Sequence, residues 1–160
     1  MKILVFSDSH GRSINIKTAL ELHKSDTEAV IFLGDGVNDA YLLKEQYPSI
    51  PFFIVRGNCD FYCPGVEDVK VINLDGIKVL ITHGHMYSAK STKSILAEKA
   101  FEYDADAVFF GHTHVPFDDI WDIEDKRIHL FNPGSIGYEG YYGIINTSKG
   151  VIVTSHGKIC

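Results

Sequence analysis

The chain has 160 residues, 45% of them hydrophobic and 22% charged, and its formal net charge is -6 at pH 7. This length and composition fit one globular domain, and we predict a single domain over residues 1–160. The acidic balance, with no run of Lys and Arg, argues against stable nucleic-acid binding, and no apolar stretch approaches the roughly 20 residues of a membrane span.

Five short apolar runs recur along the chain, and each ends in a cluster of Asp, Asn, His and Gly. They cover residues 3–6, 29–33, 52–55, 77–82 and 107–110. Each run is short, rich in β-branched or aromatic residues and closely followed by Gly, which favours buried strands over helices.

Helical spacing of apolar residues lies between several of these runs. It predicts helices around residues 14–24, 37–46 and 91–103. Strands that alternate with helices predict an α/β fold with a largely parallel core. Because ligands of such sheets bind beyond the carboxyl ends of the strands, the polar clusters are expected to converge on one site.

The last part of the chain shows strand patterns without helices between them. These strands are predicted within residues 119–131, 140–147 and 150–155. Residues 147–150 form a good hairpin turn, and a further hairpin is predicted over 67–82 around Asp75-Gly76. We expect a second, mostly antiparallel sheet that packs on the first, with helices outside.

Seven side chains in the five polar clusters are candidate metal ligands. They are Asp8, His10, Asp35, Asn58, His83, His112 and His114. Two pairs have i, i+2 spacing, which points both side chains to one side of an extended strand end. The donor set suits Mn²⁺, Fe, Zn²⁺, Ni²⁺ or Co²⁺ better than Ca²⁺. Since seven ligands exceed the need of one ion with an open position, we expect two ions that share a carboxylate.

Charge supports a phosphate substrate at such a centre. Two divalent ions would outweigh the charges of Asp8 and Asp35 and leave the site positive within an acidic protein. A site of this kind attracts phosphate and lowers the pKa of a bridging water. We therefore expect hydrolysis of a small phosphate ester by hydroxide held between the two ions.

The five clusters, in their order, resemble the signature of the calcineurin-like metallophosphoesterases. The matching motifs are Asp8-Ser9-His10, Gly34-Asp35, Gly57-Asn58-Cys59-Asp60, His83-Gly84-His85 and Gly111-His112-Thr113-His114. Asn132-Pro133-Gly134-Ser135 is also similar to a motif of the small single-domain YfcE-type phosphodiesterases. The resemblance spans the chain from residue 3 to about residue 155.

The resemblance implies a four-layer α/β/β/α sandwich of two mixed sheets flanked by helices, with metal-dependent phosphodiesterase activity. It assigns Asp8, His10, Asp35 and His114 to one ion. It assigns Asp35, Asn58, His83 and His112 to the other. Asp35 would bridge the ions, Asn58 would also contact the substrate phosphate, and Asn58, His83 and Asp35 are the expected catalytic residues. Mn²⁺ is the expected ion, with Ni²⁺, Co²⁺, Zn²⁺, Fe or Mg²⁺ as alternatives.

The chain departs from many relatives at Cys59, where they carry a His that donates a proton to the leaving group. A neutral thiol is a poor general acid, so we expect weaker activity on substrates with poor leaving groups. The residues leave open whether His85, Arg12, Asp39 and Asp60 support the site, contact substrate, or serve as caps and exposed charges. Tyr138 is predicted to pack in the core or at a sheet edge.

The sequence also bears on alternative functions, on oligomeric state and on cellular location. A phosphomonoesterase and a non-catalytic scaffold, as in the retromer subunit of this fold, stay open as alternatives. The relatives suggest a homodimer or homotetramer. Three cysteines without regular spacing fit neither a disulfide framework nor a CxxC zinc site, and the apolar start is too short for a signal peptide. These features predict a cytoplasmic location.

Overall fold

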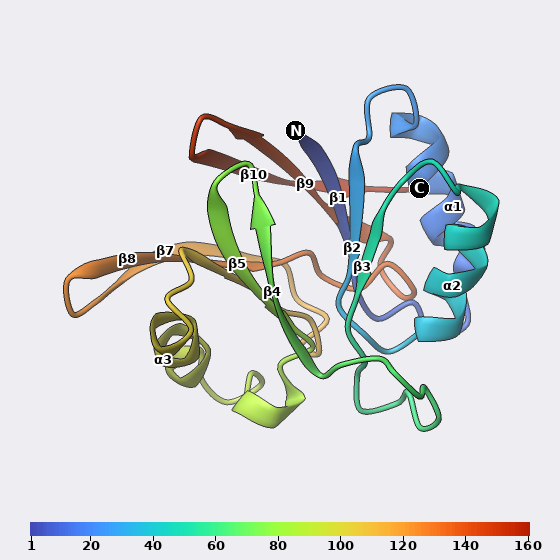
Figure 1. Ribbon diagram of the computed structural model, residues 1–160. Coiled ribbons are helices and arrows are strands. Elements are labelled where there is room, and N and C mark those ends of the chain that lie inside the picture. Colours follow the sequence, from blue (N-terminus) through green and yellow to red (C-terminus); the bar gives the residue numbers. More distant parts are fainter.

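Two five-stranded β-sheets pack face to face in the computed structural model, which describes residues 1–160 (Figure 1). The first sheet has the order β10-β9-β1-β2-β3 and consists of β1 (Lys2–Phe6), β2 (Ala29–Phe32), β3 (Phe52–Ile54), β9 (Tyr141–Ser148) and β10 (Val151–Lys158). The second has the order β4-β5-β6-β8-β7 and consists of β4 (Val69–Leu74), β5 (Ile77–Thr82), β6 (Ala107–Phe109), β7 (Phe117–Ile123) and β8 (Lys126–Asn132).

Three α-helices cover the outer faces of the sheets. They are α1 (Ser13–His23), α2 (Val37–Gln46) and α3 (Ser94–Glu102), and a short 3₁₀ helix, η1 (His85–Tyr87), follows β5. Figure 1 shows α1 and α2 together on one side of the molecule and α3 on the other. The predicted four-layer α/β/β/α sandwich is therefore confirmed. None of the helices has the length and apolar character that crossing a bilayer requires.

The alternation of side chains along β1 explains why the layers form. Ile3 and Val5 point into the core between the two sheets, whereas Leu4 and Phe6 point into the layer shared with α1 and α2. All four side chains are fully buried, so a continuous apolar run is required here rather than an alternating one. Burial of each such side chain contributes about 1.5–3 kcal/mol to folding.

Parallel strands form the centre of each sheet and determine where the polar clusters lie. In the first sheet β1, β2 and β3 are parallel, and in the second β5, β6 and β8 are parallel. The His83 ring at the end of β5 lies 2.6 Å from the carbonyl oxygen of Leu33 at the end of β2. The carboxyl ends of both parallel groups therefore meet at one edge of the sandwich.

The predicted elements are confirmed with boundaries that shift by at most three residues. The hairpin of β4 and β5 turns at Asp75-Gly76, as expected, with Leu74 paired to Ile77. The expectation that the tail strands form their own antiparallel sheet is wrong. Hairpin β9–β10 extends the first sheet beside β1, and hairpin β7–β8 extends the second beside β6.

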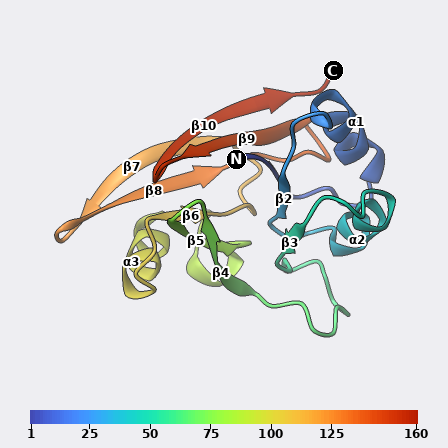
Figure 2. The same ribbon diagram turned by 45° about the horizontal axis from the view of Figure 1, so that its top comes forward.

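The open edges of the parallel groups give the physical reason. β1 and β6 would each present unpaired backbone groups on one side, and the C-terminal strands satisfy them. The two hairpins then lie side by side (Figure 2), and Thr154 of β10 donates a hydrogen bond of 2.5 Å to Asp118 of β7.

Candidate metal centre

Five of the seven predicted ligands have a left-handed backbone conformation. Their φ angles are 55° at Asp8, 46° at His10, 56° at Asp35, 65° at His112 and 62° at His114. Such conformations cost non-glycine residues about 1–3 kcal/mol each and concentrate at functional sites. The candidates therefore sit in tight loops, where the surrounding structure holds their side chains.

The geometric reason given for the i, i+2 pairs is wrong. β1 ends at Phe6 and β6 at Phe109, so neither pair lies on an extended strand. Asp8 and His10 do lie in one group of potential ligands, together with His114. His112 belongs to a different group, with Asp35 and His83, so the second pair is divided between two groups. The His10 and His114 rings are 5.4 Å apart between centroids, and those of His83 and His112 are 5.0 Å apart.

Asp8 is fully buried at the floor of the site. Its Oδ2 accepts hydrogen bonds from Ser7 Oγ at 2.6 Å and from the His112 backbone N–H at 3.1 Å. Its Oδ1 makes no hydrogen bond of acceptable geometry, although Nε2 of His114 lies 3.1 Å away and Nε2 of His10 lies 3.8 Å away. One oxygen thus fixes the carboxylate and the other is left for a ligand.

Asp35 lies between two groups of imidazoles. Its Oδ2 is 3.3 Å from Nε2 of His83 and 3.9 Å from Nε2 of His10, while its Oδ1 accepts the backbone N–H of Cys59 at 2.8 Å. Burial opposes ionisation, but His83 and Cys59 together lower the pKa of Asp35 well below the usual range of a carboxyl group. The carboxylate therefore stays charged at neutral pH.

His83 has one ring nitrogen committed to the backbone. A carbonyl oxygen only accepts, so the 2.6 Å contact of Nδ1 with Leu33 O means that Nδ1 carries a proton. Burial lowers the pKa of His83, but Asp35 and Asp8 raise it to a net value above that of free imidazole. The other ring nitrogen, Nε2, lies 3.3 Å from the Asp35 carboxylate without a hydrogen bond and is left for a cation, which would displace any proton there.

His112 completes the second group of imidazoles and is neutral at physiological pH. Burial, reinforced by the charge of His83, lowers the pKa of His112 to about 4. A neutral imidazole offers a lone pair without first losing a proton, as a metal ligand must.

Buried polar atoms without partners show that these residues fit cations. The four such atoms are Asp8 Oδ1, His10 Nε2, His83 Nε2 and His85 Nδ1. Leaving a buried polar atom unsatisfied costs about 1–3 kcal/mol, so their concentration at one place needs a compensating ligand. The ligand atoms of Asp8, His10 and His114 lie within 4.8 Å of one another, as do those of Asp35, His83 and His112.

The structure brings six of the seven candidates together and leaves Asn58 at the rim. Asn58 is exposed, and its amide donates to Cys59 Sγ at 3.5 Å rather than contacting another candidate. Cys59 itself forms a third group of potential ligand atoms with His10 and Asp35, again within 4.8 Å. Cys59 was not among the ligands predicted from the sequence, where it was considered only as a proton donor.

Asp60 and Asp39 support the loops that carry the ligands. The two oxygens of Asp60 accept four backbone N–H groups, from Asp35 and Gly57 at 2.8 Å, Gly36 at 2.9 Å and Val37 at 3.0 Å. Asp39 accepts Ser9 Oγ at 2.6 Å and the Gly11 N–H at 2.9 Å. The open question about both residues is thereby resolved, because both fix backbone around the site.

Two further aromatic side chains, His85 and Tyr138, lie beside the ligand groups. The His85 ring lies 5.5 Å from that of His83 and 6.2 Å from that of His112, which places it beside the second group. Tyr138 was expected to pack in the core or at a sheet edge, but it lies in the turn before β9 and is 56% exposed. The centroid of its ring lies 5.3 Å from that of His10 and 5.4 Å from that of His114. A hollow of about 250 Å³ at the first group is lined by His10, Gly11, Asp35, Gly36, Asn38, Asp39, Cys59 and Asp60.

A family model and a curated relative both match the chain over most of its length. Residues 1–150 match the model of the calcineurin-like phosphoesterase superfamily domain. The phosphodiesterase MJ0936 of Methanocaldococcus jannaschii is 32% identical over 171 residues, covering 93% of this chain and 95% of that protein.

Two solved structures show the same fold. A conserved uncharacterized protein of Streptococcus pneumoniae TIGR4, a predicted phosphoesterase, matches with a TM-score of 0.78 and 28% identity over 98% of this chain and 88% of that one. Vps29 of Entamoeba histolytica, in complex with Zn²⁺, matches with a TM-score of 0.74 over 99% of each chain. Its 18% identity makes it a likeness of fold alone.

Proposed function

The chain belongs to the calcineurin-like phosphoesterase superfamily, and we propose that it is a metal-dependent phosphodiesterase acting on a small phosphate ester. The observation that carries the proposal is the pair of ligand groups, Asp8–His10–His114 and Asp35–His83–His112, built around buried atoms without partners. A stable protein core does not leave such atoms unsatisfied without a reason.

We assign two divalent ions to these groups. The first would be held by Asp8, His10, Asp35 and His114. The second would be held by Asp35, Asn58, His83 and His112. Mn²⁺ is the expected ion, with Ni²⁺, Co²⁺, Zn²⁺, Fe and Mg²⁺ also matching the donors. When bound, the ions would supply Lewis-acid polarisation of the ester phosphate and a water of lowered pKa.

The chain's own residues orient the substrate and limit its leaving group. Asn58 presents an exposed amide at the rim, where it would donate to a phosphate oxygen. Burial and the neighbouring Asp35 raise the pKa of the Cys59 thiol to about 11. Even at its ordinary pKa a thiol is a weaker acid than imidazolium, so esters with good leaving groups are the favoured substrates.

The activity test compares a diester with a monoester. Metal-stripped protein is assayed with bis-p-nitrophenyl phosphate and p-nitrophenyl phosphate, with and without added Mn²⁺. The proposal expects Mn²⁺-dependent turnover that favours the diester. A preference for the monoester would replace the diesterase by a phosphomonoesterase, and no turnover with any divalent ion would reject catalysis.

Turnover, rather than metal content, separates the enzyme from the scaffold alternative. A scaffold could keep the ligand residues and bind ions without hydrolysing an ester, so metal content alone does not distinguish the two alternatives.

We also propose a cytoplasmic location and self-association. The three cysteines are free thiols, which suits a reducing compartment. Assembly into a dimer or tetramer is tested by light scattering during gel filtration.

A further inference from the structure

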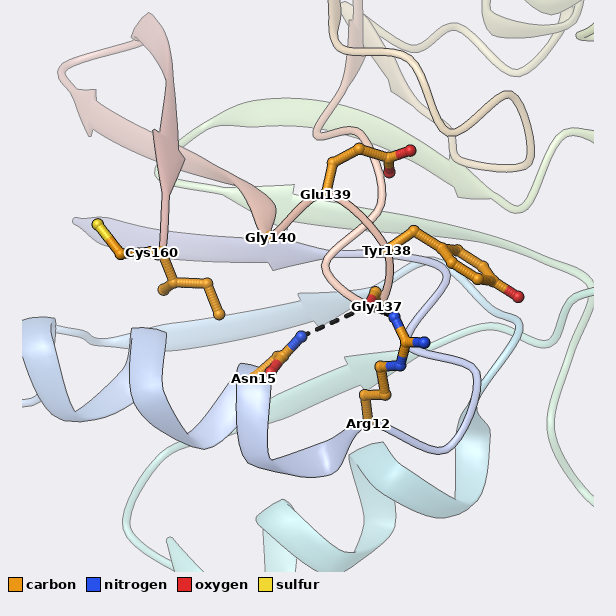
Figure 3. Close-up of a pocket in the computed structure, with 8 residues that line it drawn as sticks. Arg12, Asn15, Gly137, Tyr138, Glu139, Gly140 and Cys160 are labelled. Carbon is orange, nitrogen blue, oxygen red and sulfur yellow. Dashed lines mark hydrogen bonds between the residues drawn. The ribbon is translucent and has the colours of Figure 1, made fainter.

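A second hollow, of about 350 Å³, lies beside the metal centre. It is lined by Arg12, Asn15, Gly137, Tyr138, Glu139, Gly140, Ile159 and Cys160. Figure 3 shows Arg12 and Tyr138 next to each other at one end of this Arg12 hollow, with Cys160 at the opposite end. The hollow is polar where it approaches the centre, because the Arg12 guanidinium forms that end.

Tyr138 connects the Arg12 hollow to the candidate ligands. Its ring stacks on that of His114, with an interplanar angle of 22°, and also contacts His10. On the other side, Cζ of Arg12 lies 5.0 Å from the centroid of the same ring. A single aromatic ring therefore separates the guanidinium from the first group of ligands.

The segment that carries Tyr138 is fixed to the floor of the site. The Gly137 N–H and Ser135 Oγ both donate to the carbonyl oxygen of Asp8, at 3.1 and 3.0 Å. A Cβ atom on Gly137 would lie 2.5 Å from the Ser9 carbonyl oxygen, so glycine is needed for this close approach. The Arg12 hollow and the metal centre thus keep a constant spacing.

Arg12 is a cation without an anionic partner. The other two arginines pair with carboxylates, Arg56 with Asp68 at 2.7 Å and Arg127 with Asp122 at 3.7 Å, whereas Arg12 makes no ion pair. Its Nη1 donates to the carbonyl oxygen of Gly137, which leaves most of its five N–H donors free. In Figure 3 the carboxylate of Glu139 points away from the guanidinium.

These features describe an anion subsite that awaits a ligand. A guanidinium held by a carbonyl and an aromatic ring loses little side-chain freedom when it binds, and its planar fork matches phosphate oxygens. Since the chain carries a net charge of -6, an unpaired arginine next to a phosphate-binding centre favours a substrate with more than one anionic group.

We propose that Arg12 is a specificity-determining residue that binds a second phosphate group on the retained arm of the diester. The inference rests on the proposed phosphodiesterase function and extends it to a substrate class. The diester phosphate lies at the metal centre, its retained arm passes Tyr138, and the second phosphate enters the Arg12 hollow.

The test uses two substrates that differ by one phosphate. They are thymidine 5′-(p-nitrophenyl phosphate) and its 3′-phosphorylated counterpart, which share a leaving group. We expect a lower KM for the second, and Arg12→Met should raise that KM on the order of tenfold while leaving kcat and the KM of the first unchanged. Arg127→Met, which removes an arginine far from the site, is the matched control and should change neither.

Binding without turnover keeps this inference separate from the proposed function. Calorimetry in the presence of Mn²⁺ should show tighter binding of thymidine 3′,5′-bisphosphate than of thymidine 5′-phosphate, and Arg12→Met should remove the difference. That result supports the subsite even if no ester is hydrolysed. Equal losses for both ligands, or no loss for either, would overturn it, since Arg12 would then contact the first phosphate or none.

Discussion

Replacing Asp60 by Asn tests whether a residue that touches no candidate ligand side chain nevertheless builds the centre. The carboxylate accepts four backbone N–H groups at 2.8–3.0 Å, and an amide retains only one oxygen acceptor. Two of the four bonds are therefore lost, and the new NH₂ group faces donors. A hydrogen bond to a charged group contributes about 1.5–3 kcal/mol, and we take the lower end of this range because Asp60 is half-buried. Losing two such bonds should therefore lower the free energy of unfolding by about 3 kcal/mol.

Two readouts follow from this magnitude. For a chain of this size, about 3 kcal/mol lowers Tm by about 6–12 °C, measured by circular dichroism on metal-stripped protein. Whichever oxygen is replaced, the lost pair of bonds holds Asp35 and Gly57 or holds Gly36 and Val37, which follow Asp35 directly. We therefore also expect Mn²⁺ affinity to fall at least about tenfold, measured by calorimetry.

A matched variant controls for the change in charge. Asp125→Asn removes the same charge in the β7–β8 turn, where the carboxylate accepts no hydrogen bond, and should leave both readouts unchanged. If Asp60→Asn kept the wild-type Tm and Mn²⁺ affinity, the four hydrogen bonds to Asp60 would contribute nothing measurable to stability or metal binding, and the reasoning would be refuted.

Three further predictions concern Gly57 and Cys59. Gly57→Ala places a Cβ atom 2.1 Å from Asp35 Oδ1, so turnover should fall at least about a hundredfold, and wild-type kinetics would contradict the close approach. Cys59→His should raise turnover of alkyl esters by more than that of nitrophenyl esters, about 10²-fold at most; equal gains would argue against a missing proton donor. With its pKa raised to about 11, Cys59 stays a thiol at pH 8, so in metal-stripped protein its alkylation by iodoacetamide, followed by peptide mapping, should be slow and should accelerate as pH rises toward 11. A rate at pH 8 equal to that of a model thiol would refute the raised pKa.

Local sequence patterns were sufficient to predict most of the strands and helices. Runs such as Ile3-Leu4-Val5-Phe6 are buried on both faces, and that requirement is visible in the sequence as uninterrupted apolar residues. The placement of the C-terminal hairpins was not predictable in the same way. Which open edge a strand such as β9 joins depends on β1, more than 130 residues away, and leaves no local signal.

The residues of the site could likewise be predicted from the sequence, but their geometry could not. Asp8, His10, Asp35, His83, His112 and His114 could be singled out because each follows a strand pattern, and they do lie together. Their geometry could not be predicted, since it depends on left-handed loop conformations rather than on strand alternation. The contact of Tyr138 with His10 and His114 also escaped prediction, because an exposed tyrosine is common in sequences without such a role. Support of the site by Asp60 was one of the roles that the sequence left open, and only the four backbone contacts decide for it.

The central claim, that two cation sites share Asp35, is tested most directly by calorimetric titration of metal-stripped protein with Mn²⁺. We expect two ions per chain for the wild type, one for His112→Ala and none of comparable affinity for Asp35→Asn. Wild-type protein that binds no ion, or Asp35→Asn that still binds two, would contradict the account.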